Sequence, residues 1–115
     1  MTKYVIDYFE LPAPDAGRTS AFFSQAFGFS AQAYGDDYIE IRDGGVLGGI
    51  NGDSGDRRTA PVIGIRTDDI EAASAAIVDG GGTITRPIYA YPGGRRLFFA
   101  EPGGAELMVY QPEGE

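Results

Sequence analysis

Carboxylates, phenols and guanidinium groups are the main side chains with which this chain could do chemistry, because its 115 residues include no Cys and no His. Their absence excludes thiolate nucleophiles, disulfides and zinc fingers, and removes the commonest metal ligand and general base. Glu10 and Glu106 are the candidates for an acid–base pair, since desolvation or a like-charged neighbour raises a carboxyl pKa. Arg66 offers the alternative, because a nearby guanidinium keeps a carboxylate ionised and makes a structural ion pair.

Strand alternation gathers aromatic and charged residues around these glutamates. Successive side chains of a strand point to opposite faces, so Glu106, Met108 and Tyr110 share one face of their strand. The residues expected on such faces are Tyr8, Glu10, Gly64, Arg66, Glu106, Met108 and Tyr110. The residues expected on the opposite faces, beneath helices, are Phe9, Leu11, Ile63, Ile65, Leu107 and Val109. A surface of rings, a Met and a few charges suits a small organic ligand.

A second aromatic and basic segment lies between residues 87 and 99. Gly93 and Gly94 indicate a hairpin turn, and we expect the segment to form a mobile lip that contributes Tyr89 to ligand binding. Arg95 and Arg96 point to opposite strand faces, so one of them is available to receive a ligand carboxylate or phosphate. Arg96 is included among the ligand-binding residues, although the sequence leaves open which of the two faces inward.

The elements that position these residues begin with a strand over residues 4–13. Asp15 is placed to cap a helix over residues 16–27, and Gly28 to end it. The helix carries an apolar stripe, expected to pack on a sheet, made of Phe22, Phe23, Ala26 and Phe27. Tyr34 and Tyr38 flank a later turn and are expected to be edge or interface aromatics.

The second half repeats this order. Adding 54 to a residue number carries Asp15 to Asp69, Phe23 to Ile77 and Gly28 to Gly82. A strand over residues 62–66 and a helix over residues 70–78 are therefore expected. Short strands follow each helix, at 31–34, 38–42 and 46–50 in the first half and at 83–87, 95–100 and 105–110 in the second.

We therefore expect one α+β domain, residues 1–115, made of two β-α-β-β-β modules. The first module covers residues 4–52, a polar linker covers residues 53–60, and the second module covers residues 61–111.

With FELPAPDAGRTSAFFSQAFGF in the first module and RRLFFAEPGGAELMVYQ in the second, the chain resembles the vicinal oxygen chelate superfamily. That superfamily includes glyoxalase I, extradiol dioxygenases, and fosfomycin and bleomycin resistance proteins. The resemblance covers nearly the whole chain. It implies two modules set edge to edge, whose strands form a curled mixed sheet around a U-shaped cleft, usually in a homodimer.

The resemblance also implies where a metal would be held. Metal-using members place ligands, mostly His and Glu, on the first and last strands of each module. The matching positions here are Tyr8, Val62, Met108 and the pair Gly48 and Gly49. Val, Met and Gly offer no hard oxygen or imidazole donor, so no metal and no other cofactor is expected. A divalent ion recruited by Glu10 and Glu106 is the alternative.

The net charge and the composition limit the classes of partner that the chain can have. Nine Lys and Arg against 17 Asp and Glu give a formal charge of −8, which disfavours nucleic acid and anionic membranes. We expect a cytoplasmic homodimer that binds a small organic molecule without a metal, as the bleomycin resistance proteins do when they sequester an antibiotic. The alternative is a lyase or isomerase resembling the glyoxalases, dependent on a divalent metal or on acid–base work by the two glutamates. Whether the chain catalyses a reaction is left open.

Overall fold

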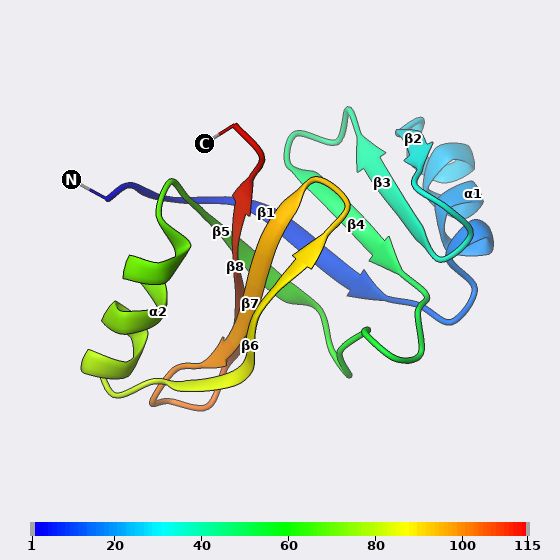
Figure 1. Ribbon diagram of the computed structural model, residues 1–115. Helices are drawn as coiled ribbons and strands as arrows, with labels where there is room; N and C mark the ends of the chain where they lie inside the picture. The colour runs from blue at the N-terminus through cyan, green and yellow to red at the C-terminus, as the bar shows by residue number, and fades with distance from the viewer. Residues whose placement is uncertain (1, 115) are drawn as a thin grey trace. The chain divides into compact units, whose positions relative to one another are not determined.

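The computed structural model of the protein describes residues 2–114, which form two compact units (Figure 1). The N-terminal unit comprises residues 8–62, and the C-terminal unit comprises residues 63–114 together with residues 2–7. The boundary at Asp7 and Tyr8 lies inside the first strand, so one strand contributes residues to both units. The segment 53–60, predicted as a linker, lies within the N-terminal unit.

The N-terminal unit is built on four strands and one helix. Its elements are β1 (Tyr4–Pro12), α1 (Ala16–Phe27), β2 (Ser30–Ala33), β3 (Tyr38–Arg42) and β4 (Leu47–Asn51). The strand order is β2-β3-β4-β1, with β1 parallel to β4 and the other pairs antiparallel. Helix α1 contacts β2, β3 and β4 (Figure 1).

The C-terminal unit repeats the same sequence of elements. They are β5 (Val62–Thr67), α2 (Ile70–Asp79), β6 (Thr83–Tyr91), β7 (Gly94–Ala100) and β8 (Glu106–Pro112). The strand order is β5-β8-β7-β6, with β5 parallel to β8 and the other pairs antiparallel. Helix α2 contacts β6, β7 and β8. The predicted α+β class, with β-α-β-β-β order and mixed strand directions, is confirmed.

Both helices begin at the predicted acidic residues. Asp15 accepts a hydrogen bond from the backbone N–H of Arg18 at 3.0 Å, and Asp69 accepts one from Ala72 at 3.1 Å. These carboxylates satisfy amide donors that have no partner within the helix. Gly28 ends α1 with a left-handed φ of +76°, which a residue without a Cβ adopts at little cost.

Each helix covers a separate hydrophobic core. In the first core Ala16 of α1 packs with Ile41 and Ile50 of the sheet. In the second core Ile70 and Ala73 of α2 pack with Leu97, Phe99 and Val109. Ile65 and Leu107 pack against the second core, as alternation predicts, but Ile63 is 48% exposed and does not.

The predicted phenylalanine stripe is wrong in part. Phe23 packs against the core under α1, whereas Phe22 and Phe27 are 59% and 60% exposed. Their rings contact Phe23, at centroid distances of 5.7 and 6.1 Å. One turn of helix is 3.6 residues, so adjacent Phe22 and Phe23 point about 100° apart and cannot both face the sheet.

The segment expected to form a lip is a hairpin of the sheet. Residues 83–91 and 94–100 are paired strands of one antiparallel hairpin, with the predicted turn at Gly93. Backbone pairing from Tyr89–Arg96 to Tyr91–Gly94 holds the segment in the sheet. Among residues 2–114, no helix has the length and apolar character needed to cross a membrane.

Candidate functional site

A row of four functional side chains crosses the sheet of the C-terminal unit. The strand register places Arg66 beside Tyr110, Tyr110 beside Arg96, and Arg96 beside Tyr89, one from each strand. Residues directly opposite on neighbouring strands project from the same face. The next row of this face holds Gly64, Met108 and Phe98. Arg96 therefore joins the predicted residues Arg66, Met108 and Tyr110 on the face that α2 does not cover. We call it the open face, although Arg96, Met108 and Phe98 are at most 5% exposed.

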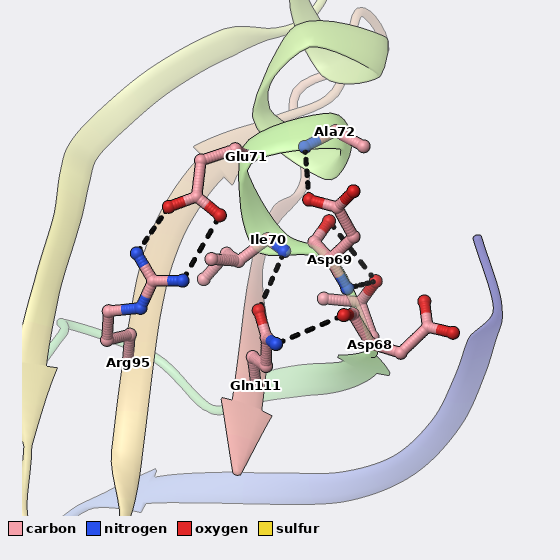
Figure 2. Close-up of polar contacts among 8 residues, drawn as sticks. Asp68, Asp69, Ile70, Glu71, Ala72, Arg95 and Gln111 are labelled. Atoms are coloured by element: carbon pink, nitrogen blue, oxygen red, sulfur yellow. Dashed lines mark hydrogen bonds and ion pairs between the residues drawn. The ribbon is translucent and has the colours of Figure 1, made fainter. Parts of the chain in front are cut away.

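Arg95 projects to the other side, toward α2 (Figure 2). Its guanidinium makes two bonds to the carboxylate of Glu71, one of them 3.1 Å from Nη2 to Oε1, and they lower the pKa of that carboxyl. Nearby, Gln111 accepts the backbone N–H of Ile70 at 2.9 Å and donates to the carbonyl of Asp68 at 3.0 Å. These contacts secure the start of α2 against β8, so Arg95 has a structural partner on the helix side.

Asp7 connects two residues of the row. Its carboxylate accepts a hydrogen bond from Tyr110 Oη at 2.5 Å and lies 2.9 Å from Nε of Arg66. Burial and the bond to Asp7 raise the pKa of Tyr110 above its ordinary value, so the phenol stays neutral and donates. Sequence reasoning missed Asp7, because alternation from Tyr8 and Glu10 assigns it to the opposite face. The available signal was an acid within an otherwise aromatic and β-branched strand.

Arg96 is a buried cation, with 5% of its surface exposed. Its Nε donates to the phenol oxygen of Tyr89 at 2.5 Å, and its Nη1 lies 3.7 Å from the sulfur of Met108. The guanidinium carbon is 5.4 Å from the ring centres of Tyr89 and Tyr91. Ring faces attract cations, and a hydrogen bond fixes the orientation of the group. Burial raises the pKa of Tyr91, while Arg96 opposes that shift.

The remaining candidates of this unit lie around the row. Met108 is 1% exposed and stands opposite Phe98 in the register. Glu106 accepts a hydrogen bond from the hydroxyl of Thr85 at 2.6 Å. Arg86, which sequence reasoning did not select, stacks on Tyr89, with its guanidinium carbon 3.6 Å from the ring centre. The open face thus combines aromatic rings with charges of both signs.

In the N-terminal unit, Tyr8 is paired with Tyr38. Their phenol oxygens are 2.7 Å apart, and both lie over Gly49, where an added Cβ would be 1.8 Å from the Tyr38 oxygen. The expectation that Tyr38 is an edge or interface aromatic is therefore wrong. It fails because the register brings β3 next to β4, whose glycine leaves room for a ring from each side.

Glu10 is the most buried carboxylate among the predicted site residues, at 1% exposure. The side-chain amide of Asn51 lies 3.4 Å from Glu10 and donates to Asp56 at 2.9 Å. Asn51 is a contributor that the sequence did not reveal, since the contact joins β4 to β1 across the sheet. Glu10 belongs to the N-terminal unit and Glu106 to the C-terminal unit.

The residues at the positions that the resemblance assigns to a metal do not fit one. Val62 is buried hydrocarbon, and the sulfur of Met108 faces the guanidinium of Arg96. The Tyr8 oxygen shares a hydrogen bond with Tyr38, and Gly48 and Gly49 have no donor. In residues 2–114, no three His, Cys, Asp or Glu side chains gather as a metal would require. Divalent ions such as Mg²⁺ and Ca²⁺ need several oxygen ligands, so we derive no step through a metal.

Residues 5–109 match the model of the Glyoxalase/Bleomycin resistance protein/Dioxygenase superfamily. The match covers most of the sequence and both units, and the chain belongs to this superfamily. No curated protein sequence matches the chain.

Solved structures share the fold at low sequence identity. A protein described as NAD-dependent benzaldehyde dehydrogenase from Legionella pneumophila matches with a TM-score of 0.78 and 8% identity, covering 93% of this chain and 99% of that one. A glyoxalase/bleomycin resistance protein/dioxygenase superfamily member from Vibrio splendidus 12B01 matches with a TM-score of 0.66 and 17% identity, covering 96% of this chain and 99% of that one. Methylmalonyl-CoA epimerase from Mycobacterium tuberculosis matches with a TM-score of 0.67 and 12% identity, covering 93% of this chain and 87% of that one. At these identities the likeness establishes the fold alone.

Proposed function

We propose that the protein binds a small organic molecule at the open face of the C-terminal unit, without a resident metal. The observation that carries the proposal is the row Arg66, Tyr110, Arg96 and Tyr89, one residue from each strand on the face opposite α2. The role that follows is sequestration of an antibiotic or a metabolite. Such a role requires binding without chemistry.

The row offers each kind of contact that ligand recognition needs. The rings of Tyr89, Tyr91 and Tyr110 supply area for stacking. The phenol of Tyr110 and the guanidinium groups supply directional hydrogen bonds. Small-molecule sites typically combine a mostly apolar lining with a few fixed polar groups of this kind.

A second candidate is an acid–base lyase or isomerase, and the burial of Glu10 favours it. In this function Glu10 or Glu106 exchanges a proton with a substrate, and the side-chain amide of Asn51 lies 3.4 Å from Glu10. Conversion of a bound compound, lost in Glu10→Gln while binding persists, would establish this function over sequestration.

The first experiment is a thermal-shift screen with aromatic, cationic and carboxylate compounds, run with EDTA and then with added Mn²⁺, Ni²⁺ or Zn²⁺. A ligand that binds only the folded chain raises the melting temperature by mass action. We expect an organic compound to raise it equally with and without EDTA. Shifts produced only by metals, or by no compound at all, contradict the proposal.

Paired variants locate the site. Tyr91→Leu removes a ring of the open face, whereas Tyr34→Leu removes an exposed ring of the N-terminal unit. We expect Tyr91→Leu to reduce the ligand-induced shift and Tyr34→Leu to preserve it. Equal losses in both variants would place binding elsewhere. The same samples test the proposed homodimer by light scattering after gel filtration.

A further inference from the structure

The chain contains one asparagine, Asn51, and a glycine follows it. An Asn–Gly pair is chemically prone to deamidation, because glycine has no Cβ to shield its backbone nitrogen from the preceding side-chain amide. Asn51 is the last residue of β4, is 1% exposed and leads into the segment 53–60. We propose that Asn51 is a latent modification site, which the folded segment protects and whose deamidation releases that segment irreversibly. This inference goes beyond ligand binding and does not depend on it.

The reaction joins two groups that are neighbours along the chain. The backbone nitrogen of Gly52 attacks Cγ of Asn51, so that a new N–Cγ bond forms, the Cγ–Nδ2 bond breaks, and ammonia leaves with the amide proton. Water then opens the cyclic imide at one of its two carbonyls. The product is aspartate or isoaspartate at position 51, and the only reagent consumed is water.

The fold engages the groups that this reaction uses. The backbone N–H of Gly52 donates to the carbonyl of Asp37 at 2.7 Å, which holds the proton that must leave. The side-chain oxygen of Asn51 accepts the backbone N–H of Asp53 at 2.9 Å, and its Nδ2 donates to the carboxylate of Asp56 at 2.9 Å. Because the amide is held at both of its polar atoms, it cannot rotate toward the attacking nitrogen while these bonds persist.

Segment 53–60 is closed on the site by contacts of its own. The carbonyl of Asp53 accepts the backbone N–H groups of Asp56 at 3.0 Å and Arg57 at 2.8 Å. Nη1 of Arg57 donates to the carbonyl of Gly52 at 2.8 Å. Local opening of such a segment costs less free energy than global unfolding. The rate of deamidation should therefore follow the opening of this segment.

The product of deamidation cannot restore these contacts. An ionised carboxylate only accepts hydrogen bonds, whereas Nδ2 of Asn51 donates to Asp56 and lies 3.4 Å from the carboxylate of Glu10. The reaction would therefore place a third carboxylate beside two others. Isoaspartate also lengthens the backbone at a residue whose carbonyl accepts the N–H of Ala13 at 3.0 Å. Once formed, either product should leave the segment open.

The first test incubates the full chain in mildly alkaline buffer, with and without denaturing urea. Released ammonia and peptide mass mapping give the rate, and the single asparagine makes the assignment unambiguous. We expect the chain in urea to deamidate at least about tenfold faster than the folded chain, because only opened molecules react. Equal rates would overturn the protection, and an unreactive chain in urea would overturn the site.

Variants identify the attacking nitrogen and the protecting segment. In urea, where the fold no longer matters, Gly52→Ala should slow the reaction because a Cβ hinders the nitrogen. In the folded chain, Arg57→Ala removes the bond to the Gly52 carbonyl and should speed deamidation about threefold or more. Arg18→Ala removes an exposed guanidinium from α1 and should keep the wild-type rate. An unchanged rate in Gly52→Ala contradicts the chemistry, and an unchanged rate in Arg57→Ala contradicts the role of the segment.

Trypsin cleavage after Arg57 and Arg58 tests the release of the segment. Asn51→Asp should be cut there at least about tenfold faster than the wild type, because the segment stays open. Gln25→Glu, which adds the same charge at an exposed position of α1, should be cut at the wild-type rate. If Asn51→Asp does not fold, the deamidated fraction of folded wild type, separated by anion exchange, replaces it. Cleavage at the wild-type rate in the deamidated chain would overturn the release.

Discussion

The two units repeat one backbone order and differ on the faces opposite their helices. On this face the last strand of the N-terminal unit, β4, presents Gly49, which the rings of Tyr8 and Tyr38 cover. The last strand of the C-terminal unit, β8, presents Met108 and Tyr110 itself, beside Arg66 and Arg96. The repeat therefore preserved the hydrogen-bonded framework, while the side chains that do chemistry diverged. The strands of the C-terminal unit therefore carry the candidate binding residues of this face, whereas in the N-terminal unit rings fill the corresponding space.

Gly48→Val, on the α1 side of β4, should give the largest effect. An added Cβ would lie 2.0 Å from the ring of Phe9, so the ring must move, and we expect a loss of about 3 kcal/mol in the free energy of unfolding. Chemical denaturation measures it.

Two companion variants isolate the cause. Gly17→Ala meets only Asp15 at 3.7 Å in α1 and should be neutral or stabilising. Gly48→Val in a Phe9→Ala background should cost less than in the wild type, since the clashing ring is gone. An undiminished cost in that background would mean that the backbone, and not the ring, demands glycine.

The tyrosine bonds of the two units provide the next test. Tyr110→Phe removes a donor to the carboxylate of Asp7 and should cost about 2 kcal/mol, while Tyr38→Phe removes a bond between two neutral phenols and should cost about 1 kcal/mol. Urea denaturation of both variants gives the two losses. The reverse order would show that the ion pair between Asp7 and Arg66 compensates for the lost phenol.

The turn between β7 and β8 should make stability depend on pH. The Glu101 carboxylate accepts backbone N–H bonds from Ala105 at 2.7 Å and Gly103 at 3.0 Å, which lower its pKa in the folded state. A lowered folded pKa gives stability that is present above the unfolded pKa, about 4.3, and is lost as pH falls through the folded value.

Glu101→Gln should therefore be less stable than the wild type near neutral pH, with the difference shrinking below about pH 4. Melting temperatures across pH 3 to 7 measure this dependence. Asp36→Asn, in a turn of the N-terminal unit, is the control for removing one acid. If the stability difference between Glu101→Gln and the wild type is the same at all pH values, the amide destabilises the turn through its shape and not through the loss of charge.

The smallest change in stability is expected for a substitution in the corresponding turn of the N-terminal unit, between β3 and β4. Asp43 adopts a left-handed φ of +65° between β3 and β4 and accepts a hydrogen bond from Ser30. Asp43→Gly relieves the backbone and loses that bond, so the two effects oppose and the change should stay below about 1 kcal/mol. A larger loss by thermal denaturation would identify the Ser30 contact as the dominant interaction of that turn.

Much of the framework could be predicted from sequence because its signals are local. Asp15 and Asp69 cap helices within three residues of themselves, and Gly28 ends a helix through its own backbone freedom. Alternation likewise placed Ile65, Leu107 and Val109 under α2 and Met108 and Tyr110 on the other face. Alternation failed at Asp7, next to the boundary between the units. The pairing of β6 with β7 could not be read in detail from either strand alone, because it depends on the partner strand.

By itself, the sequence determined the order of elements, the caps and the absence of His and Cys, since these depend on composition and near neighbours. The tertiary structure alone decided that Arg96 and not Arg95 joins the row, because strand register fixes the face on which each side chain lies. It also decided that Tyr110 meets Asp7, 103 positions away along the chain. Such contacts depend on the path of the whole chain, which no local pattern encodes.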